Sequence, residues 1–163
     1  MTADPVTVRA ATVADTATVE AFLDRHGMRM AARMGELVDT GEYPALLAER
    51  DGRVVGVLVY IPGDRDVEIL ALYADVGGTG VGTALLGAVV EIAQDAGVGR
   101  IWLITTNDNV DALRFYQRRG FHLARLYPGA VDHARTTLKP SIPRIGDHGI
   151  PIRDELELEC RRR

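Results

Sequence analysis

The chain has 163 residues, of which 47% are hydrophobic and 26% are charged. This length and composition are typical of one globular domain, which we expect to span residues 1–163. The 19 Lys and Arg residues against 23 Asp and Glu residues give a net charge of −4, so we expect no nucleic-acid partner. No uncharged apolar run reaches the roughly 20 residues that a bilayer requires. Residues 1–15 do not resemble a secretion signal, and the prediction is a cytoplasmic protein without a membrane partner.

Three residue types that carry covalent chemistry occur only once in the chain. Lys139, Ser141 and Cys160 are the only residues of their types, and all three lie late in the sequence. A Schiff-base lysine, a serine nucleophile or a catalytic cysteine would therefore lie in a loop-like or terminal context, which disfavours these three mechanisms. The four histidines have no metal-ligand spacing, so we predict no metal site.

The first part of the chain predicts both strands and helices. Asp51-Gly52 stands between two apolar runs and is a strong hairpin signal, so the strands on either side should be antiparallel. The spacing of apolar residues predicts the following elements: a strand at 6–10, a helix at 15–25 with Thr12 as its N-cap, a second helix at 28–38, and strands at 45–49 and 53–61.

A strand, a glycine-rich loop and a helix follow one another in the middle of the chain. The strand at 67–74 leads into glycines that open a long helix ending near Gly97, and a buried strand follows at 100–105. The two strands of such a βαβ unit should be parallel. The remaining predicted elements are a helix at 110–119, a strand at 121–127, a short helix at 130–138, an irregular segment at 139–152 and a strand at 154–159.

The glycine-rich loop runs from Gly77 to Thr83. Free backbone N–H groups and the positive dipole end at a helix start favour an anion there. Two familiar nucleotide loops do not fit, because Thr83 stands where a dinucleotide loop has its third glycine and the P-loop lysine is missing. An ordinary glycine-rich connection remains the alternative at this point, and a nucleotide-binding domain ranks far lower.

The segment 107–121 adds a second motif: Asn109 precedes an amphipathic helix, Tyr116 lies seven residues later, and Gly120-Phe121 follows. Together the two motifs resemble the GNAT superfamily of N-acetyltransferases, with its Q/R-x-x-G-x-G/A loop and its N-x-x-A-x-x-x-Y-x-K/R-x-G-F helix. The resemblance extends from Val6 to Glu159. It implies an α/β fold with a central mixed β-sheet flanked by helices and a βαβ core that binds acetyl-CoA as a co-substrate.

The resemblance also implies roles for individual residues. Tyr116 matches the tyrosine that acts as general acid toward the departing thiolate, and Asn109 matches an asparagine that contacts the cofactor. One departure is Gly77, which stands where the family usually has Gln or Arg. The residues expected to bind acetyl-CoA are Leu72, Tyr73, Ala74, Gly77, Gly78, Thr79, Gly80, Val81, Gly82, Thr83, Asn109 and Arg118.

Glu68 is the candidate general base, because an amine attacks a thioester only after losing its proton. Strand alternation predicts Glu68 on the face shared by Leu70 and Leu72. The alternative is a solvated acidic strand end, since Asp64 and Asp66 lie in the same turn. For Tyr116 the alternative to a catalytic role is packing in the core.

The expected function is acetyl-CoA-dependent N-acetylation of a primary amine, on a small molecule or a peptide, by direct attack. The alternative is a non-catalytic acyl-CoA-binding protein of the same fold. The sequence does not identify the acceptor amine, the length of the acyl group or the general base. The oligomeric state is also open, with a homodimer as the expectation.

Two further segments could serve the acceptor. Arg25, Arg29 and Arg33 recur every four residues and could form a basic stripe, or else a solvated face countered by nearby carboxylates. The segment 139–152 is rich in Pro and Ile. We expect it to pack over the acceptor side of the cleft or against a partner subunit, with 147–149 as its turn, and the alternative is a self-packed surface loop.

Overall fold

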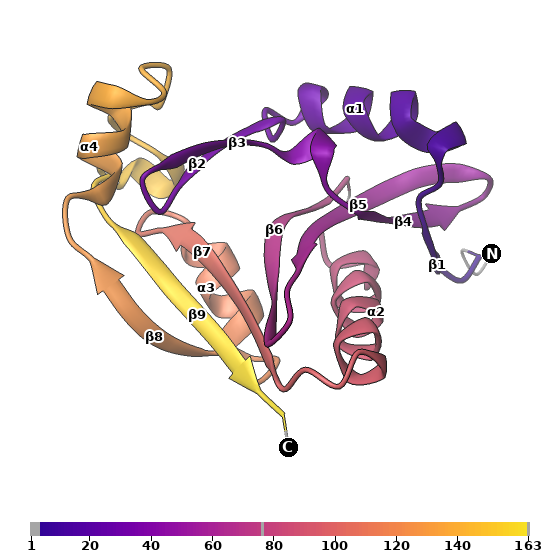
Figure 1. Cartoon of the computed structure of the whole chain (residues 1–163). Coiled ribbons are helices and arrows are strands. Elements are labelled where there is room, and N and C mark those ends of the chain that lie inside the picture. Colours follow the sequence, from indigo (N-terminus) through magenta and orange to yellow (C-terminus); the bar gives the residue numbers. More distant parts are fainter. Residues whose placement is uncertain (1–3, 76, 163) are drawn as a thin grey trace. The chain divides into compact units, whose positions relative to one another are not determined.

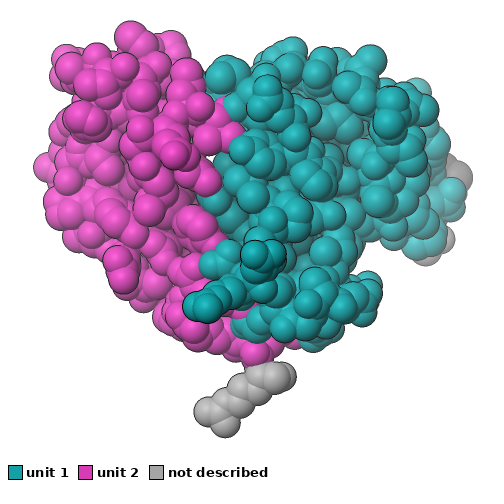
Figure 2. Space-filling model, in the orientation of Figure 1, with its two compact units in different colours: residues 1–30, 39–99 teal, residues 31–38, 100–163 magenta. Residues whose placement is uncertain are grey.

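The computed structural model describes residues 4–75 and 77–162 (Figure 1). Contacts divide the chain into two compact units, which Figure 2 colours separately. Unit 1 comprises Met1–Met30 and Asp39–Gly99, and unit 2 comprises Ala31–Val38 and Arg100–Arg163. The expectation that 1–163 forms a single domain stays a prediction.

Unit 1 is built on four antiparallel strands in the order β1-β4-β5-β6. The predicted hairpin is confirmed: Asp51 and Gly52 join β4 and β5 with φ of 52° and 71°, the left-handed conformation of a two-residue turn. The elements of unit 1 are β1 (Thr7–Ala10), η1 (Val13–Asp15), α1 (Thr16–Arg25), η2 (Thr40–Glu42), β4 (Ala45–Arg50), β5 (Arg53–Pro62), β6 (Asp66–Ala74) and α2 (Val81–Asp95).

The two helices of unit 1 cover opposite faces of its sheet (Figure 1). The buried side chains of Phe22 and Leu23 on α1 pack with Val57 of β5. The neighbouring residue, Gly56, faces α2, because a Cβ atom there would lie 2.6 Å from the Val81 side chain. Since successive strand residues point to opposite faces, we call these faces the α1 face and the α2 face.

A bulge in β6 changes which side chains share the α1 face. Val59 pairs with Ala71 and the next residue, Tyr60, pairs with Ile69, so Leu70 is an extra residue on β6. The predicted sharing of one face by Glu68 and Leu72 is therefore wrong. Glu68 pairs with Ile61 and lies on the α1 face, whereas Leu72 lies on the α2 face.

The predicted helix at 28–38 is wrong, because these residues form strands β2 (Met30–Arg33) and β3 (Glu36–Asp39). Met34 and Gly35 connect them with φ of 51° and 75°, and two successive left-handed residues form a tight hairpin turn that no helix accommodates. The short apolar pattern of this segment fits a helix or a hairpin.

Unit 2 contains a sheet with the strand order β7-β9-β8, in which both pairings are antiparallel, and most of the hairpin formed by β2 and β3. The predicted parallel pairing of 67–74 with 100–105 concerns strands of different units and stays a prediction. Within residues 4–75 and 77–162, no helix has both the length and the apolar character needed to cross a membrane. Besides this hairpin, the elements of unit 2 are β7 (Arg100–Thr106), α3 (Val110–Gln117), β8 (His122–Tyr127), α4 (Ala130–Thr137), η3 (Asp147–Gly149) and β9 (Glu155–Arg161).

Candidate active site

The glycine loop ends in an exposed helix start in unit 1. Gly78 and Gly80 have φ of 75° and 81°, a conformation that favours glycine, and Gly80 is the N-cap of the 15-residue helix α2. Arg50 holds the loop from β4, because its Nη2 atom donates a hydrogen bond of 3.1 Å to the Thr79 carbonyl. Gly77 and Gly78 leave open space within 4 Å of a Cβ position. The geometry suits an anion approaching backbone N–H groups.

The end of β6 leads directly to this loop. Tyr73 lies on the α1 face, where its ring stacks on His26 with centroids 3.7 Å apart. The Nε2 atom of His26 lies 2.9 Å from the Asp75 carboxylate, so α1 is tied to the strand end. Leu72 and Ala74 pair with Leu58 and Gly56 of β5 and lie on the α2 face. The side chains of the predicted cofactor strand therefore divide between the two faces.

Glu68 lies earlier on β6 and is only 5% exposed. This burial does not fit the alternative of a solvated acidic strand end. A buried carboxylate on the strand that leads to the glycine loop is consistent with a general base, since Glu is one of the residue types that take up protons in enzymes. Its role as a base stays a prediction.

Unit 2 contains the other predicted residues, Asn109, Tyr116 and Arg118. Asn109 caps α3: its Oδ1 atom accepts from the Ala112 N–H at 3.2 Å, and its Nδ2 atom donates to the Thr105 hydroxyl at 3.3 Å. Arg118 is exposed at the C-cap of the same helix. Contact of either residue with a cofactor stays a prediction.

Tyr116 is 6% exposed, and its ring lies edge-on to Phe115 and Phe121, with centroids 5.0 and 5.2 Å away. Burial raises the pKa of the Tyr116 phenol above its ordinary value. The phenol therefore keeps its proton across the neutral range, which is the form that a general acid needs. This packing fits both alternatives for Tyr116, because a core residue and a general acid each need a fixed position.

The residues just before Asn109 have a structural role that the sequence did not reveal. Asp108 is 5% exposed and accepts hydrogen bonds from the Thr106 hydroxyl and from the Asp147 N–H. Asn107 binds the backbone of Arg153 through its Oδ1 atom. Asn107 and Asp108 thus attach the segment before β9 to the start of α3. Only the side-chain partners, which lie some 40 residues away, could have indicated this role.

The segment 139–152 is held within unit 2. The predicted turn is confirmed as η3, and His148 in that turn lies 3.0 Å from the Asp111 carboxylate on α3. A bridge joins Ile145 to Pro151. These contacts favour the self-packed alternative, while packing over the acceptor or against a partner subunit stays a prediction.

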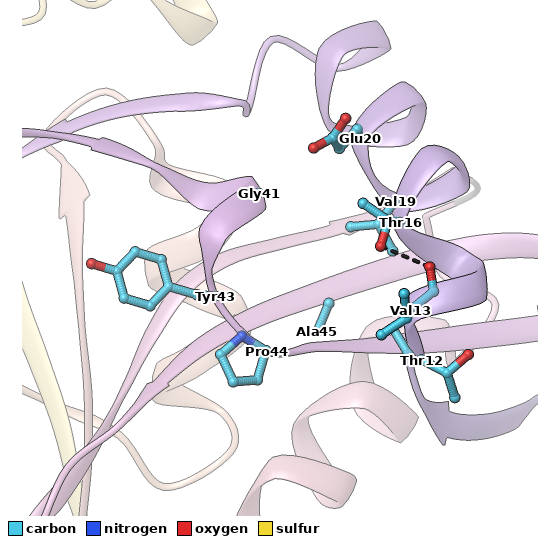
Figure 3. A pocket seen from close by; sticks show the side chains of 10 residues that line it. Thr12, Val13, Thr16, Val19, Glu20, Gly41, Tyr43, Pro44 and Ala45 are labelled. Atoms are coloured by element: carbon cyan, nitrogen blue, oxygen red, sulfur yellow. Dashed lines mark hydrogen bonds between the residues drawn. The ribbon is translucent and has the colours of Figure 1, made fainter.

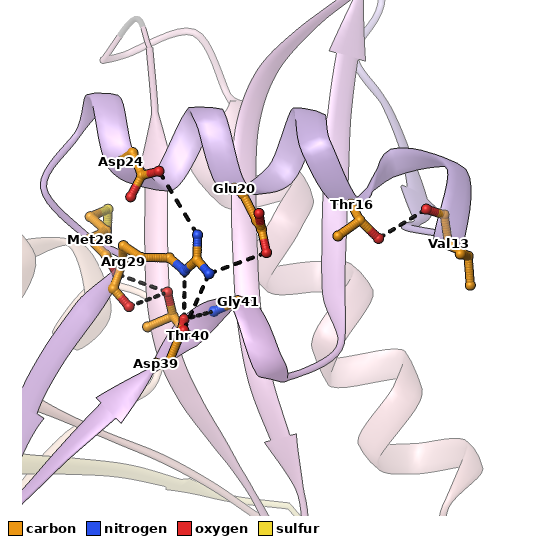
Figure 4. Close-up of polar contacts among 9 residues, drawn as sticks. All are labelled: Val13, Thr16, Glu20, Asp24, Met28, Arg29, Asp39, Thr40 and Gly41. Carbon is orange, nitrogen blue, oxygen red and sulfur yellow. Dashed lines mark hydrogen bonds and ion pairs between the residues drawn. The ribbon is translucent and has the colours of Figure 1, made fainter.

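The three arginines do not form a basic stripe, because no helix spans them. Arg25 lies 3.6 Å from Asp75, and Arg33 lies 3.1 Å from Glu36. Arg29 contacts several carboxylates of unit 1 at once (Figure 4). The alternative of arginines countered by neighbouring carboxylates is therefore the correct one.

Comparisons with known proteins point to one family. Residues 13–121 match the model of the acetyltransferase (GNAT) family. YdhI, an uncharacterized protein of Bacillus subtilis (strain 168), is 48% identical over 105 residues, which cover 64% of this chain and 65% of YdhI. An uncharacterized N-acetyltransferase of Mycobacterium tuberculosis (strain ATCC 25618 / H37Rv) is 41% identical over 96 residues, covering 57% of this chain and 62% of that protein.

Two further proteins extend the comparison. Streptothricin acetyltransferase of Streptomyces lavendulae is 28% identical over 115 residues, covering 67% of this chain and 61% of that protein. The structure of a GNAT family acetyltransferase from Elizabethkingia anophelis with acetyl-CoA bound has a TM-score of 0.68 and 19% identity, and the match covers 98% of this chain and 99% of that chain.

The matched region is that of a family of acetyltransferases. The chain belongs to the GNAT acetyltransferase family, and the predicted α/β fold is confirmed. The match spans less than two thirds of the length of each of the three relatives named above.

Proposed function

We propose that the protein transfers the acetyl group of acetyl-CoA to a primary amine of a small molecule or a peptide. The observation that carries the proposal is the family match over residues 13–121, which contains a glycine loop shaped for an anion at the start of α2. The name of the Mycobacterium relative supports nitrogen as the acceptor atom, and the name of the Streptomyces relative supports a small molecule.

In this proposal acetyl-CoA binds mainly through backbone groups. The N–H groups around Gly78, Gly80 and Gly82 bind the pyrophosphate at the start of α2. The pantetheine lies along residues 72–74 like an added strand. Asn109 and Arg118 provide further contacts to the CoA. The acetyl-CoA bound to the Elizabethkingia neighbour supports this choice of co-substrate.

The reaction then needs two proton transfers. The buried Glu68 carboxylate accepts a proton, directly or through water, from the amine that attacks the thioester carbon. Backbone N–H groups at the end of β6 stabilise the tetrahedral oxyanion. As the C–S bond breaks, the protonated Tyr116 phenol donates to the departing sulfur. The products are the N-acetyl amine and CoA with a free thiol.

The test is CoA thiol release from acetyl-CoA, measured with a panel of primary amines and without any amine. The proposal predicts release that depends on an added amine. Acetyl-CoA binding without amine-dependent release would favour the non-catalytic acyl-CoA binder instead. Neither outcome depends on knowing the natural acceptor.

A further inference from the structure

Unit 1 contains a pocket that the proposed catalytic residues do not use (Figure 3). It lies between the first turns of α1 and the connection from η2 to β4, and its volume is about 190 Å³. Val19, Pro44 and Ala45 supply apolar walls, and Thr16 and Glu20 supply polar ones. This volume is small for a nucleotide and suits one end of a small aliphatic molecule.

The polar groups of this pocket favour a cation. The Glu20 carboxylate faces the η2 turn across the pocket (Figure 3) and is 38% exposed. The Thr16 hydroxyl donates its proton to the Val13 carbonyl at 2.9 Å, so its oxygen lone pairs remain available as acceptors. An ammonium group has three donors and no acceptor, so it suits the Glu20 carboxylate, and the Thr16 hydroxyl adds a second acceptor to the lining of the pocket.

The surrounding charges leave Glu20 only partly neutralised. Its Oε1 atom lies 3.2 Å from the Arg29 guanidinium, but Arg29 also binds Asp39 at 2.6 Å and lies 3.9 Å from Asp24 (Figure 4). The hydrogen bond from Arg29 lowers the pKa of Asp39, so Asp39 remains charged. Three carboxylates therefore share one guanidinium, and the net charge beside the pocket is negative.

The pocket lies on the same face of unit 1 as Glu68. Ala45, which follows Pro44, packs in the core beneath α1, so the alternate residue Tyr43 also lies on the α1 face. The Pro44 carbonyl accepts a hydrogen bond from the Tyr60 N–H, so Pro44 lies opposite Tyr60 and the preceding residue, Tyr43, lies opposite Ile61. Ile61 in turn pairs with Glu68 of β6. Two strand spacings of about 4.8 Å separate Tyr43 from Glu68, roughly 10 Å in all.

We propose that this Glu20 pocket binds a second, positively charged group of the acceptor, so that the preferred substrates are diamines or amines with a distant cationic group. The inference rests on the proposed function, and it names the substrate class. One amine reacts near Glu68, while the ammonium at the other end of the molecule binds the Glu20 carboxylate in the pocket that Thr16 also lines. Monoamines of equal length lack this second contact.

The test compares putrescine with butylamine, which have the same carbon chain and differ in one ammonium group. We expect kcat/KM for putrescine to exceed that for butylamine by about ten-fold or more, as one charge-assisted hydrogen bond would give. Glu20→Gln should raise the KM for putrescine about ten-fold and change the KM for butylamine less than two-fold. Equal losses for the two amines, or no loss, would overturn the proposal.

Two more variants separate the pocket from general electrostatics and from folding. Glu42→Gln removes the same charge from an exposed residue that does not line the pocket, and it should leave the ratio of the two amines unchanged. Thr16→Leu fills the pocket while Glu20 keeps its charge, and it should also remove the preference for putrescine. An effect of Glu42→Gln as large as that of Glu20→Gln would contradict a site at the pocket.

Binding measurements separate this inference from the proposed function. Calorimetry and amide NMR shifts on the full chain, without acetyl-CoA, should detect putrescine at Thr16 and Gly41 and much weaker binding of butylamine. If no amine is acetylated, the proposed function fails, whereas putrescine binding that Glu20→Gln weakens still supports the pocket. If both amines turn over but neither binding nor turnover depends on Glu20, only the inference about the pocket fails.

Discussion

The glycine loop of unit 1 and helix α3 of unit 2 carry the two family motifs, and they are built in different ways. The loop offers backbone groups: Gly78 and Gly80 adopt left-handed conformations before α2, with open space around Gly78. Helix α3 instead places one side chain, Tyr116, in a buried aromatic setting. A site made of backbone tolerates few added atoms, whereas a site made of one side chain depends on a single functional group. Changes in the loop should therefore affect acetyl-CoA binding, and changes at Tyr116 should affect turnover.

The largest expected effect comes from Tyr116→Phe, which removes only the hydroxyl. If the phenol donates to the departing thiolate, kcat should fall roughly 10²- to 10⁴-fold, as for other general acids. Acetyl-CoA affinity should change much less, because the ring and its contacts remain. Steady-state kinetics with one competent amine measures both quantities, and an unchanged kcat in the folded variant would assign Tyr116 to packing alone.

The pH dependence of the parent sharpens this prediction. Burial raises the pKa of Tyr116 above its ordinary value of about 10, so the phenol stays protonated to a higher pH than a free phenol. Loss of kcat through its ionisation should therefore begin only above pH ~10, and this loss should be absent in Tyr116→Phe. Superimposable profiles of parent and variant would contradict the acid role.

The next largest effect is expected for a substitution at the glycine loop, where acetyl-CoA affinity should fall. Gly82→Val adds a branched side chain in the first turn of α2, beside the proposed pyrophosphate site, and should weaken acetyl-CoA binding roughly 10- to 100-fold by obstructing one or two charge-assisted hydrogen bonds. Calorimetry measures this change. Gly82 is a better position than Gly80, because the left-handed backbone of Gly80 would strain any side chain.

Gly87→Val is the matched control for this experiment. It makes the same change in the same helix at an exposed position with open space around it. Acetyl-CoA affinity should remain that of the parent. Equal weakening by the two variants would mean that the helix, and not the approach of a phosphate, is affected.

A third prediction concerns the contacts that hold the segment before β9. Asp108→Ala leaves the Asp147 N–H without its partner and should lower the free energy of unfolding by about 1–3 kcal/mol. Asp111→Ala, at an exposed residue in the first turn of α3, should cost less than about 1 kcal/mol. Denaturant unfolding measures the difference between the two, and equal costs would show that Asp108 does not attach this segment.

The smallest effect is expected at acidic pH in the sheet of unit 2. Hydrogen bonds from Arg100 and Arg161 lower the pKa of Glu159 to about 2, well below its ordinary value. A lowered pKa means that this carboxylate stabilises the fold at neutral pH and loses its contribution as the pH falls from about 4.5 toward 2. Urea midpoints should therefore depend less on pH in Glu159→Gln than in the parent across this range. An identical dependence would exclude the contribution.

The sequence predicted elements whose signals are local. The Asp51-Gly52 hairpin, the Asn109 cap and the glycine loop each depend on the conformational preferences of one or two residues. The prediction of a helix at 28–38 is wrong because the apolar spacing of this segment fits a helix and a hairpin equally well. A methionine at position 34 does not indicate a left-handed conformation. The sequence also gives no sign of the bulge at Leu70, because neither a glycine nor a proline stands at that position.

Prediction of the candidate site was limited by distance along the chain. Tyr116 and Glu68 are predicted from motif and strand position, but the face on which Glu68 lies depends on how β6 pairs with β5. The Glu20 pocket combines α1 with residues that follow η2, more than 20 positions later. No spacing rule links such residues, since only the fold brings them together.

In the proposed reaction the acetyl group moves from sulfur to an amine nitrogen. The most direct measurement is NMR of the product formed from acetyl-CoA with a ¹³C-labelled carbonyl and an amine labelled with ¹⁵N. Transfer to nitrogen gives a labelled amide carbon coupled to the labelled nitrogen, formed in step with CoA release. Labelled acetate as the sole product, or acetyl-CoA that is bound but unchanged, would contradict it.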